Sequence, residues 1–236
     1  MHEAVVNAHF LAYCCMSMVG NAQKFDVQVI SGRPQVRQGS RQYHLHDFLR
    51  GSNVVLKAKQ ASVSRFDKLR AQLDESLAAG QSYPWVDLIA MHAEKMISDM
   101  VESVLGALYL DTRGDLAVCE DFLERLGVLP MMRRILESGM NTTHPKEGLG
   151  VLADQDEVSY ASEQVHDQDQ GLMLWKCLVK VGERNVARVD GCISREEAEV
   201  RAADQGISIL TAQDMPRGDR KKRNFEKEGA IVETGA

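Results

Sequence analysis

Residues 95–116, KMISDMVESVLGALYLDTRGDL, decide the fold of this chain, because their apolar side chains recur at helical spacing. On a helical wheel, Asp99, Glu102 and Gly106 fall within one narrow stripe. Apolar residues fill most of the remaining circumference, so we expect this helix to be largely buried. Buried carboxylates require compensation by cations, hydrogen bonds or a metal ion. The pattern therefore predicts a helix that carries a small polar site on one side.

The spacing of Asp99 and Glu102 has two interpretations. Residues at positions i and i+3 of a helix are neighbours and can present oxygens to one hard cation such as Mg²⁺. Lys95, one turn earlier, could then orient a carboxylate or contact a phosphate. Alternatively, the stripe is a solvated face on which Lys95 is a salt-bridge partner. The spacing alone leaves both interpretations open.

The composition limits the classes of function. The 236 residues include 34 acidic and 28 basic side chains, a formal net charge of −6, so the chain as a whole is not a basic nucleic-acid-binding protein. Five cysteines without a CxxC pair argue against a disulfide framework and a zinc site, and indicate intracellular thiols. The sequence contains no apolar run of membrane-spanning length and does not start like a signal peptide. We expect a cytoplasmic or nuclear protein without a membrane partner.

Helical patterns dominate the first 140 residues. Residues 1–20 are mostly apolar and suit a buried helix that stops at Gly20. Further helical patterns occur at residues 46–49, 64–77 and 115–125. Short connections between such segments favour a compact all-α bundle.

Residues 31–41, SGRPQVRQGSR, interrupt these patterns and are predicted to form a loop. The loop contains Arg33, Arg37 and Arg41, which could add phosphate affinity, although a solvated surface insert is the simpler interpretation. The nearby pair His44 and His46 precedes an apolar segment. We expect surface or capping histidines there, not metal ligands.

A different pattern begins near residue 145. A short helix is expected over 145–153, and LWKCLVKV at 174–181 alternates in the manner of a half-buried strand. Ser194 followed by Glu197 forms a capping-box pattern ahead of a helix that extends to about residue 210. With two further strands, these elements predict a small α+β module of order α-β-β-β-α.

The polar residues at the end of the chain, 214–236, include the basic run RKKR at 220–223. A charged, disordered tail is the simplest interpretation of this composition. The run could also add phosphate affinity or act as a nuclear address.

The segment 95–116 closely resembles the second carboxylate segment of ribonuclease III domains, with Lys95, Asp99 and Glu102 at matching positions. Three other stretches are similar to the C-terminal region of fungal Dicer-like proteins: AVVNAHFLAYCCM near the start, CEDFLERLGVLPMMRRIL after the helix and HPKEGLGVLA at the domain junction. The resemblance covers roughly residues 2–210.

The resemblance implies a mainly α protein in which an all-α ribonuclease III domain precedes a small α+β domain. Residues 1–140 would form a partial ribonuclease III domain with a family-type insert at about 31–80. Residues 144–213 would form a double-stranded-RNA-binding-like domain, and 214–236 the charged tail.

The resemblance also implies a chemistry. Ribonuclease III domains work in pairs, so the partners would be double-stranded RNA and a second ribonuclease III domain, from a homodimer or another chain. Four acidic residues hold Mg²⁺, for which Mn²⁺ can substitute, and the metal activates water for phosphodiester hydrolysis. By this resemblance Asp99 and Glu102 are metal ligands, and Lys95 belongs to the catalytic set. The function would be Dicer-like endonuclease cleavage in RNA processing and RNA interference.

The chain departs from the family pattern at one point. The other two acidic residues of the family belong to a glutamate-rich signature helix that precedes the equivalent of residues 2–16, and no stretch of this sequence matches it. We therefore expect Met1 to be an internal methionine and the chain to be truncated at its N-terminus. The alternative to an active nuclease is an impaired fragment that acts only as a double-stranded-RNA-binding or dimerisation module.

The second module departs from its family pattern as well. Family members carry a lysine cluster at the start of the last helix, where it contacts phosphates, whereas this chain has SREE at 194–197. Arg195 and His166, the latter expected in a loop between strands, are the remaining candidate RNA contacts. Both RNA binding and a packing or protein-contact role stay open for this module.

Overall fold

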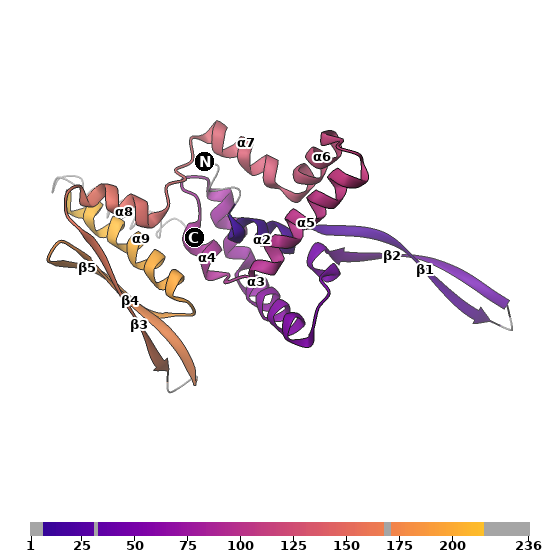
Figure 1. The fold of residues 1–236 in the computed structure, drawn as a ribbon, viewed down its shortest axis with the longest axis horizontal. Helices are drawn as coiled ribbons and strands as arrows, with labels where there is room; N and C mark the ends of the chain where they lie inside the picture. The colour runs from indigo at the N-terminus through magenta and orange to yellow at the C-terminus, as the bar shows by residue number, and fades with distance from the viewer. Residues whose placement is uncertain (1–6, 31–32, 168–170, 215–236) are drawn as a thin grey trace, which may run out of the picture. The chain divides into compact units, whose positions relative to one another are not determined.

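The computed structural model describes residues 7–30, 33–167 and 171–214 (Figure 1). The chain divides into two compact units, Met1–Thr142 and Thr143–Ala236, and each is described by itself. The predicted tail and its basic run lie outside the described residues, apart from residue 214. Across the described ranges, no helix combines the length and apolarity needed to cross a membrane.

The first unit is mainly helical, but it also contains a β-hairpin, so the prediction of an all-α bundle is wrong for it. Its helices are η1 (Leu45–Phe48), α2 (Ala8–Ser17), α3 (Asn53–Ala79), α4 (Trp85–Ala90), α5 (Lys95–Asp111), α6 (Leu116–Leu126) and α7 (Val128–Ser138). Helix α2 supplies much of the core, because Phe10, Cys15 and Met16 are almost completely buried. The buried helix expected at the start is thus confirmed over its described part, but the chain leaves it as a strand at Val19, before the expected end at Gly20.

The predicted arginine-rich loop is wrong in its conformation. Strands β1 (Val19–Ile30) and β2 (Arg33–His44) pair as an antiparallel hairpin whose register runs from Val19 opposite His44 to Ile30 opposite Arg33. The missed signal is the alternation of apolar and polar residues in QKFDVQV at 23–29, which favours a strand. The arginine side chains of this hairpin lie outside the described part, so their solvated character stays a prediction.

The two histidines after the hairpin differ from each other. His44 caps η1, since its backbone N–H donates to Asp47 Oδ2 at 2.9 Å, which confirms the capping role. His46 is buried, so the expected surface position is wrong for it. Burial lowers the pKa of His46 against the opposing charge of Asp47, and its ring stacks on His44 at 5.1 Å.

The second unit has the element order α-β-β-β-α. Its elements are α8 (Pro145–Ala153), β3 (Val158–Asp167), β4 (Leu172–Val181), β5 (Arg184–Cys192) and α9 (Arg195–Asp214). The strands form an antiparallel sheet of order β3-β4-β5, and Figure 1 shows α8 and α9 side by side over one face of it. Cys177, Val179 and Val181 are buried against these helices, which confirms the predicted alternation in β4.

The start of α9 is held by a modified capping box. The Glu197 backbone N–H donates to Ser194 Oγ at 3.1 Å, as predicted. The reciprocal bond comes from the backbone N–H of Ile193, at 2.9 Å from Glu197 Oε2, one residue earlier than in the standard pattern. These two hydrogen bonds hold the first turn of α9 in place.

We predict that Leu149→Ala lowers the free energy of unfolding by about 2–5 kcal/mol, because Leu149, a residue of α8, is completely buried in the core that the sheet forms with α8 and α9. Urea unfolding followed by circular dichroism measures the change. Leu152→Ala in the same helix is the matched control, since its side chain is 44% exposed, and should change the value by about 0.5 kcal/mol or less. Equal losses in the two variants would contradict the packing described.

Candidate functional sites

The predicted carboxylate stripe lies on the solvent side of α5. Lys95 Nζ contacts Asp99 Oδ1 at 2.5 Å, and the two side chains are 78% and 43% exposed. Glu102 is exposed one turn further along the helix. A Cβ built at Gly106 would meet no atom of the described residues within 4 Å, so the stripe continues open to that position. The structure therefore brings Lys95, Asp99 and Glu102 onto one accessible face.

The expectation that α5 is largely buried is wrong. Its buried residues are Ile97, Ser98 and Val101, and α2 is the element with which α5 has its most extensive contact. Towards the C-terminal end, Tyr109 and Leu110 are 47% and 77% exposed. The physical reason is that burial depends on neighbouring elements, and the described helices cover only one side of this apolar rod.

The ammonium group of Lys95 compensates the negative charge of Asp99. The hydrogen bond and charge of Asp99 raise the pKa of the Lys95 ammonium, which is largely exposed. Ser103 Oγ donates to the Asp99 backbone carbonyl at 2.8 Å, so it does not compete for the carboxylate. An exposed pair of this kind contributes little to stability, and it can open when a ligand arrives.

The stripe fits part of a magnesium site. Carboxylates at i and i+3 can provide two oxygen ligands to an octahedral Mg²⁺ that keeps several waters. Among the described residues, no group of three or more His, Cys, Asp and Glu side chains is placed to hold a metal ion. Asp99 and Glu102 would therefore need water or groups from elsewhere to complete the coordination.

A second polar cluster lies at the start of α9. Glu199 Oε2 contacts Lys146 Nζ of α8 at 2.7 Å, and its Oε1 accepts from Arg195 Nε at 2.7 Å and from Ser162 Oγ at 3.1 Å. The Lys146 ammonium also lies over the Tyr160 ring, 4.7 Å from its centroid. The cluster gathers two cations, a hydroxyl and an aromatic ring around one carboxylate.

Burial and hydrogen bonding have opposite effects on the pKa of Glu199. Burial by itself would raise the pKa of this carboxyl, but the hydrogen bonds from Lys146, Arg195 and Ser162 outweigh it and lower the pKa. The side chain of Glu199 is 11% exposed, against 40% for Lys146 and 64% for Arg195. The cations are thus accessible while the anion beneath them is nearly covered.

The two candidate RNA contacts have different surroundings. Arg195 is the first residue of α9 and is engaged by Glu199. His166 lies in β3 opposite Met173, so its expected position in a loop is wrong, because the β3–β4 pairing continues to residue 167. Its side chain is exposed. A role for either residue in RNA binding stays a prediction.

Sequence reasoning missed Lys146 and Glu199. The i, i+4 spacing of Arg195 and Glu199 was a readable sign of an ion pair. Lys146 is 53 positions from Glu199 in the chain, and no local pattern links them. Only the packing of α8 beside α9 brings this lysine to the carboxylate.

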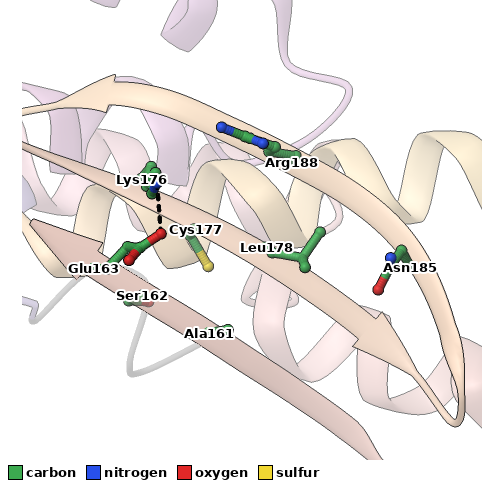
Figure 2. A pocket seen from close by; sticks show the side chains of 8 residues that line it. All are labelled: Ala161, Ser162, Glu163, Lys176, Cys177, Leu178, Asn185 and Arg188. Carbon is green, nitrogen blue, oxygen red and sulfur yellow. Dashed lines mark ion pairs between the residues drawn. The ribbon is translucent and has the colours of Figure 1, made fainter. Parts of the chain in front are cut away.

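The face of the β3-β4-β5 sheet opposite α8 and α9 carries a shallow hollow of about 590 Å³ (Figure 2). Lys176 and Leu178 line it, because alternate residues of β4 point away from the helices. Lys176 Nζ pairs across the strands with Glu163 Oε1 at 2.5 Å. A cross-strand pair such as this stabilises a sheet by about 0.2–1 kcal/mol. It is a structural feature of the sheet and not a set of reactive groups.

The second unit is similar to a known domain family. Residues 138–231 match the family model of the Dicer-like protein 2 double-stranded-RNA-binding domain. The chain is 35% identical over 213 residues to Dicer-like protein 2 of Coccidioides immitis (strain RS), which covers 89% of this chain and 15% of that protein. These matches support the assignment of the chain to the fungal Dicer-like proteins.

Other Dicer-like proteins give the same result. Dicer-like protein 2 of Aspergillus oryzae (strain ATCC 42149 / RIB 40) is 38% identical over 210 residues, covering 88% of this chain and 15% of that protein. The Dicer-like protein 2 of Cryphonectria parasitica is 35% identical over 178 residues, covering 75% of this chain and 12% of that protein. The chain thus spans about 15% of the length of the first two relatives. No solved structure matches it.

The matched family model covers the second unit, so the ribonuclease III assignment of the first unit stays a prediction.

We predict that the contribution of Glu199 to stability is lost in acid. A carboxylate whose folded pKa lies below its ordinary value of about 4.3 stabilises the fold above that value, and the stabilisation disappears as the pH falls through the folded pKa. The difference in free energy of unfolding between the unmodified chain and Glu199→Gln should be constant near neutral pH and shrink below about pH 4. Urea unfolding at several pH values measures it, and a difference that grows on acidification would contradict the ion pairs.

Proposed function

We propose that the chain is the ribonuclease III and double-stranded-RNA-binding part of a Dicer-like protein, and that it contributes to Mg²⁺-dependent cleavage of double-stranded RNA. The observation that carries the proposal is the accessible stripe of Lys95, Asp99 and Glu102 on α5. The similarity to Dicer-like protein 2 sequences over nearly nine-tenths of the chain supports the same conclusion.

Each residue of the stripe has a proposed role. Asp99 and Glu102 would bind Mg²⁺, or Mn²⁺ in its place, and the bound metal would supply an activated water and stabilise charge on phosphate oxygens. Lys95, which already contacts Asp99, would orient that carboxylate and limit the negative charge of the stripe in the absence of metal. The exposure of the stripe allows a phosphodiester backbone to approach it.

The exposed apolar end of α5 supports a pairing surface. Tyr109 and Leu110 in α5 and Leu116 at the start of α6 are exposed and close in sequence. Exposed large apolar residues that cluster commonly mark contacts between proteins. A second ribonuclease III domain, from a homodimer or another chain, is the proposed occupant.

A second candidate function is a module that binds RNA or pairs with another nuclease domain without cutting. The presence of only two carboxylates in the stripe favours it, because metal sites lose geometry and charge neutralisation when ligands are missing. Cleavage and binding assays on the same protein separate the two functions.

For the nuclease proposal, we expect a long duplex RNA to be cut in the presence of Mg²⁺, and Asp99→Asn or Glu102→Gln to slow cutting by more than about 100-fold. Mutation of a residue that only supports a metal ligand typically lowers metal affinity or activity by about 10- to 100-fold, and mutation of a direct ligand should lower activity further. Product formation on a denaturing gel is the measurement.

Glu120→Gln provides the matched control for cleavage, since Glu120 is an exposed glutamate on α6, and its rate should equal that of the unmodified chain. Absence of product, or equal cutting by all variants, would refute the nuclease proposal and leave the non-cutting module.

For the metal proposal, we expect Mg²⁺ to raise the melting temperature of the chain, because a ligand that binds only the folded state stabilises it. The double change Asp99→Asn with Glu102→Gln should abolish the rise, whereas Glu120→Gln should retain it. Differential scanning fluorimetry across a Mg²⁺ titration measures the shift. If the double variant responds like the unmodified chain, the stripe is not the metal site.

A further inference from the structure

Near the start of α9, the carboxylate of Glu199 is surrounded by hydrogen-bond donors of the kind that bind phosphate. Glu199 accepts from an ammonium, a guanidinium and a hydroxyl within 2.7–3.1 Å, which is the donor set that would suit a phosphate group. The carboxylate is 11% exposed, whereas the two cations reach solvent. Glu199 thus occupies, from within the fold, the position that an incoming anion would take between Lys146 and Arg195.

The charge of the surroundings agrees with this arrangement. Residues 195–199, REEAE, carry one cation and three carboxylates. Over residues 143–214 there are fourteen acidic side chains against seven lysines and arginines. Binding to a nucleic-acid backbone depends on cations that neutralise phosphates, so a module with this balance has few cations to offer.

We infer that Glu199 sets the affinity of the second unit for double-stranded RNA by holding Lys146 and Arg195 in ion pairs that compete with RNA phosphates. The inference rests on the proposed binding of double-stranded RNA. Lys146 and Arg195 come from α8 and α9, so their common contact with Glu199 makes them one two-cation site. Because both cations are partly exposed, a phosphate can reach them, but opening their pairs leaves the nearly covered carboxylate of Glu199 without compensation, and this cost weakens RNA binding.

This role differs from simple positioning of the two cations. If Glu199 only held them in place for RNA, neutralising it would scatter them and weaken binding. If Glu199 competes with phosphate, neutralising it releases two cations and strengthens binding. Glu199→Gln distinguishes the two cases, since glutamine keeps the size of the side chain and can still accept from Ser162.

The test is fluorescence anisotropy of the full 236-residue chain with a labelled RNA duplex of about 20 base pairs, longer than the roughly 16 that such domains span. EDTA is present so that no cutting occurs. Titrations at several salt concentrations give the affinity and its salt dependence. We expect Glu199→Gln to bind about three- to tenfold more tightly, and its log–log salt slope to steepen by about one to two.

A double-mutant comparison assigns the gain to the two cations. Lys146→Gln and Arg195→Gln should each have little effect in the unmodified chain, where Glu199 neutralises them, and should remove most of the gain when combined with Glu199→Gln. Glu183→Gln, at the exposed turn between β4 and β5, removes one negative charge elsewhere and should leave affinity and slope nearly unchanged.

Several results would overturn the inference. Weaker or unchanged binding by Glu199→Gln, with the unmodified chain still binding, refutes the role of Glu199 and leaves RNA binding intact. A large loss of affinity from Lys146→Gln or Arg195→Gln in the unmodified chain refutes it without requiring the Glu199 variant to fold. If no protein in the series binds the duplex, both the inference and the proposed RNA binding fail.

Discussion

The packing of α5 against α2 is the contact on which the candidate nuclease site depends. Ile97, Ser98 and Val101 are the buried residues of α5, and α2 is its main neighbour. Because a helix has 3.6 residues per turn, burying these residues turns Asp99 and Glu102 towards solvent. Unpaired carboxylates would be costly in the core, so this orientation also decides which side of α5 the rest of the unit covers. The exposure of the stripe is therefore a consequence of core packing.

The cost of burying a charge also explains the polar cluster around Glu199 in the second unit. Glu199 is nearly covered, and its cost is offset by two cations and a hydroxyl that converge on it from α8, α9 and β3. Removing one of the donors leaves the nearly covered carboxylate less compensated. The cluster thus links the two helices to the sheet electrostatically, next to the apolar core of Leu149, Cys177 and Val179. If the second unit binds RNA as proposed, the same residues contribute to both fold stability and RNA affinity.

Patterns of short range were predicted well. The alternation in β4 and the Ser194 cap of α9 depend on residues only a few positions apart, and the structure contains both. The hairpin β1–β2 shows where composition misleads, because glycine, serine and arginine suggested a loop while the alternation beside them favoured a strand. The buried His46 was missed for a different reason. The segment η1 contacts α2, which lies far from it in sequence, so the neighbours of His46 in the chain do not reveal its burial.

The sequence by itself determined the helical stripe of α5, the alternation in β4 and the similarity to Dicer-like proteins, since each is a property of residue order along one segment. Only the tertiary structure decided which half of α5 is buried, because burial depends on which helices lie beside it. Only the tertiary structure joined Lys146 to Glu199 across 53 positions, because ion pairs depend on distance in space. The chemistry of the stripe could thus be proposed from sequence, whereas the contact of Lys146 with Glu199 could not.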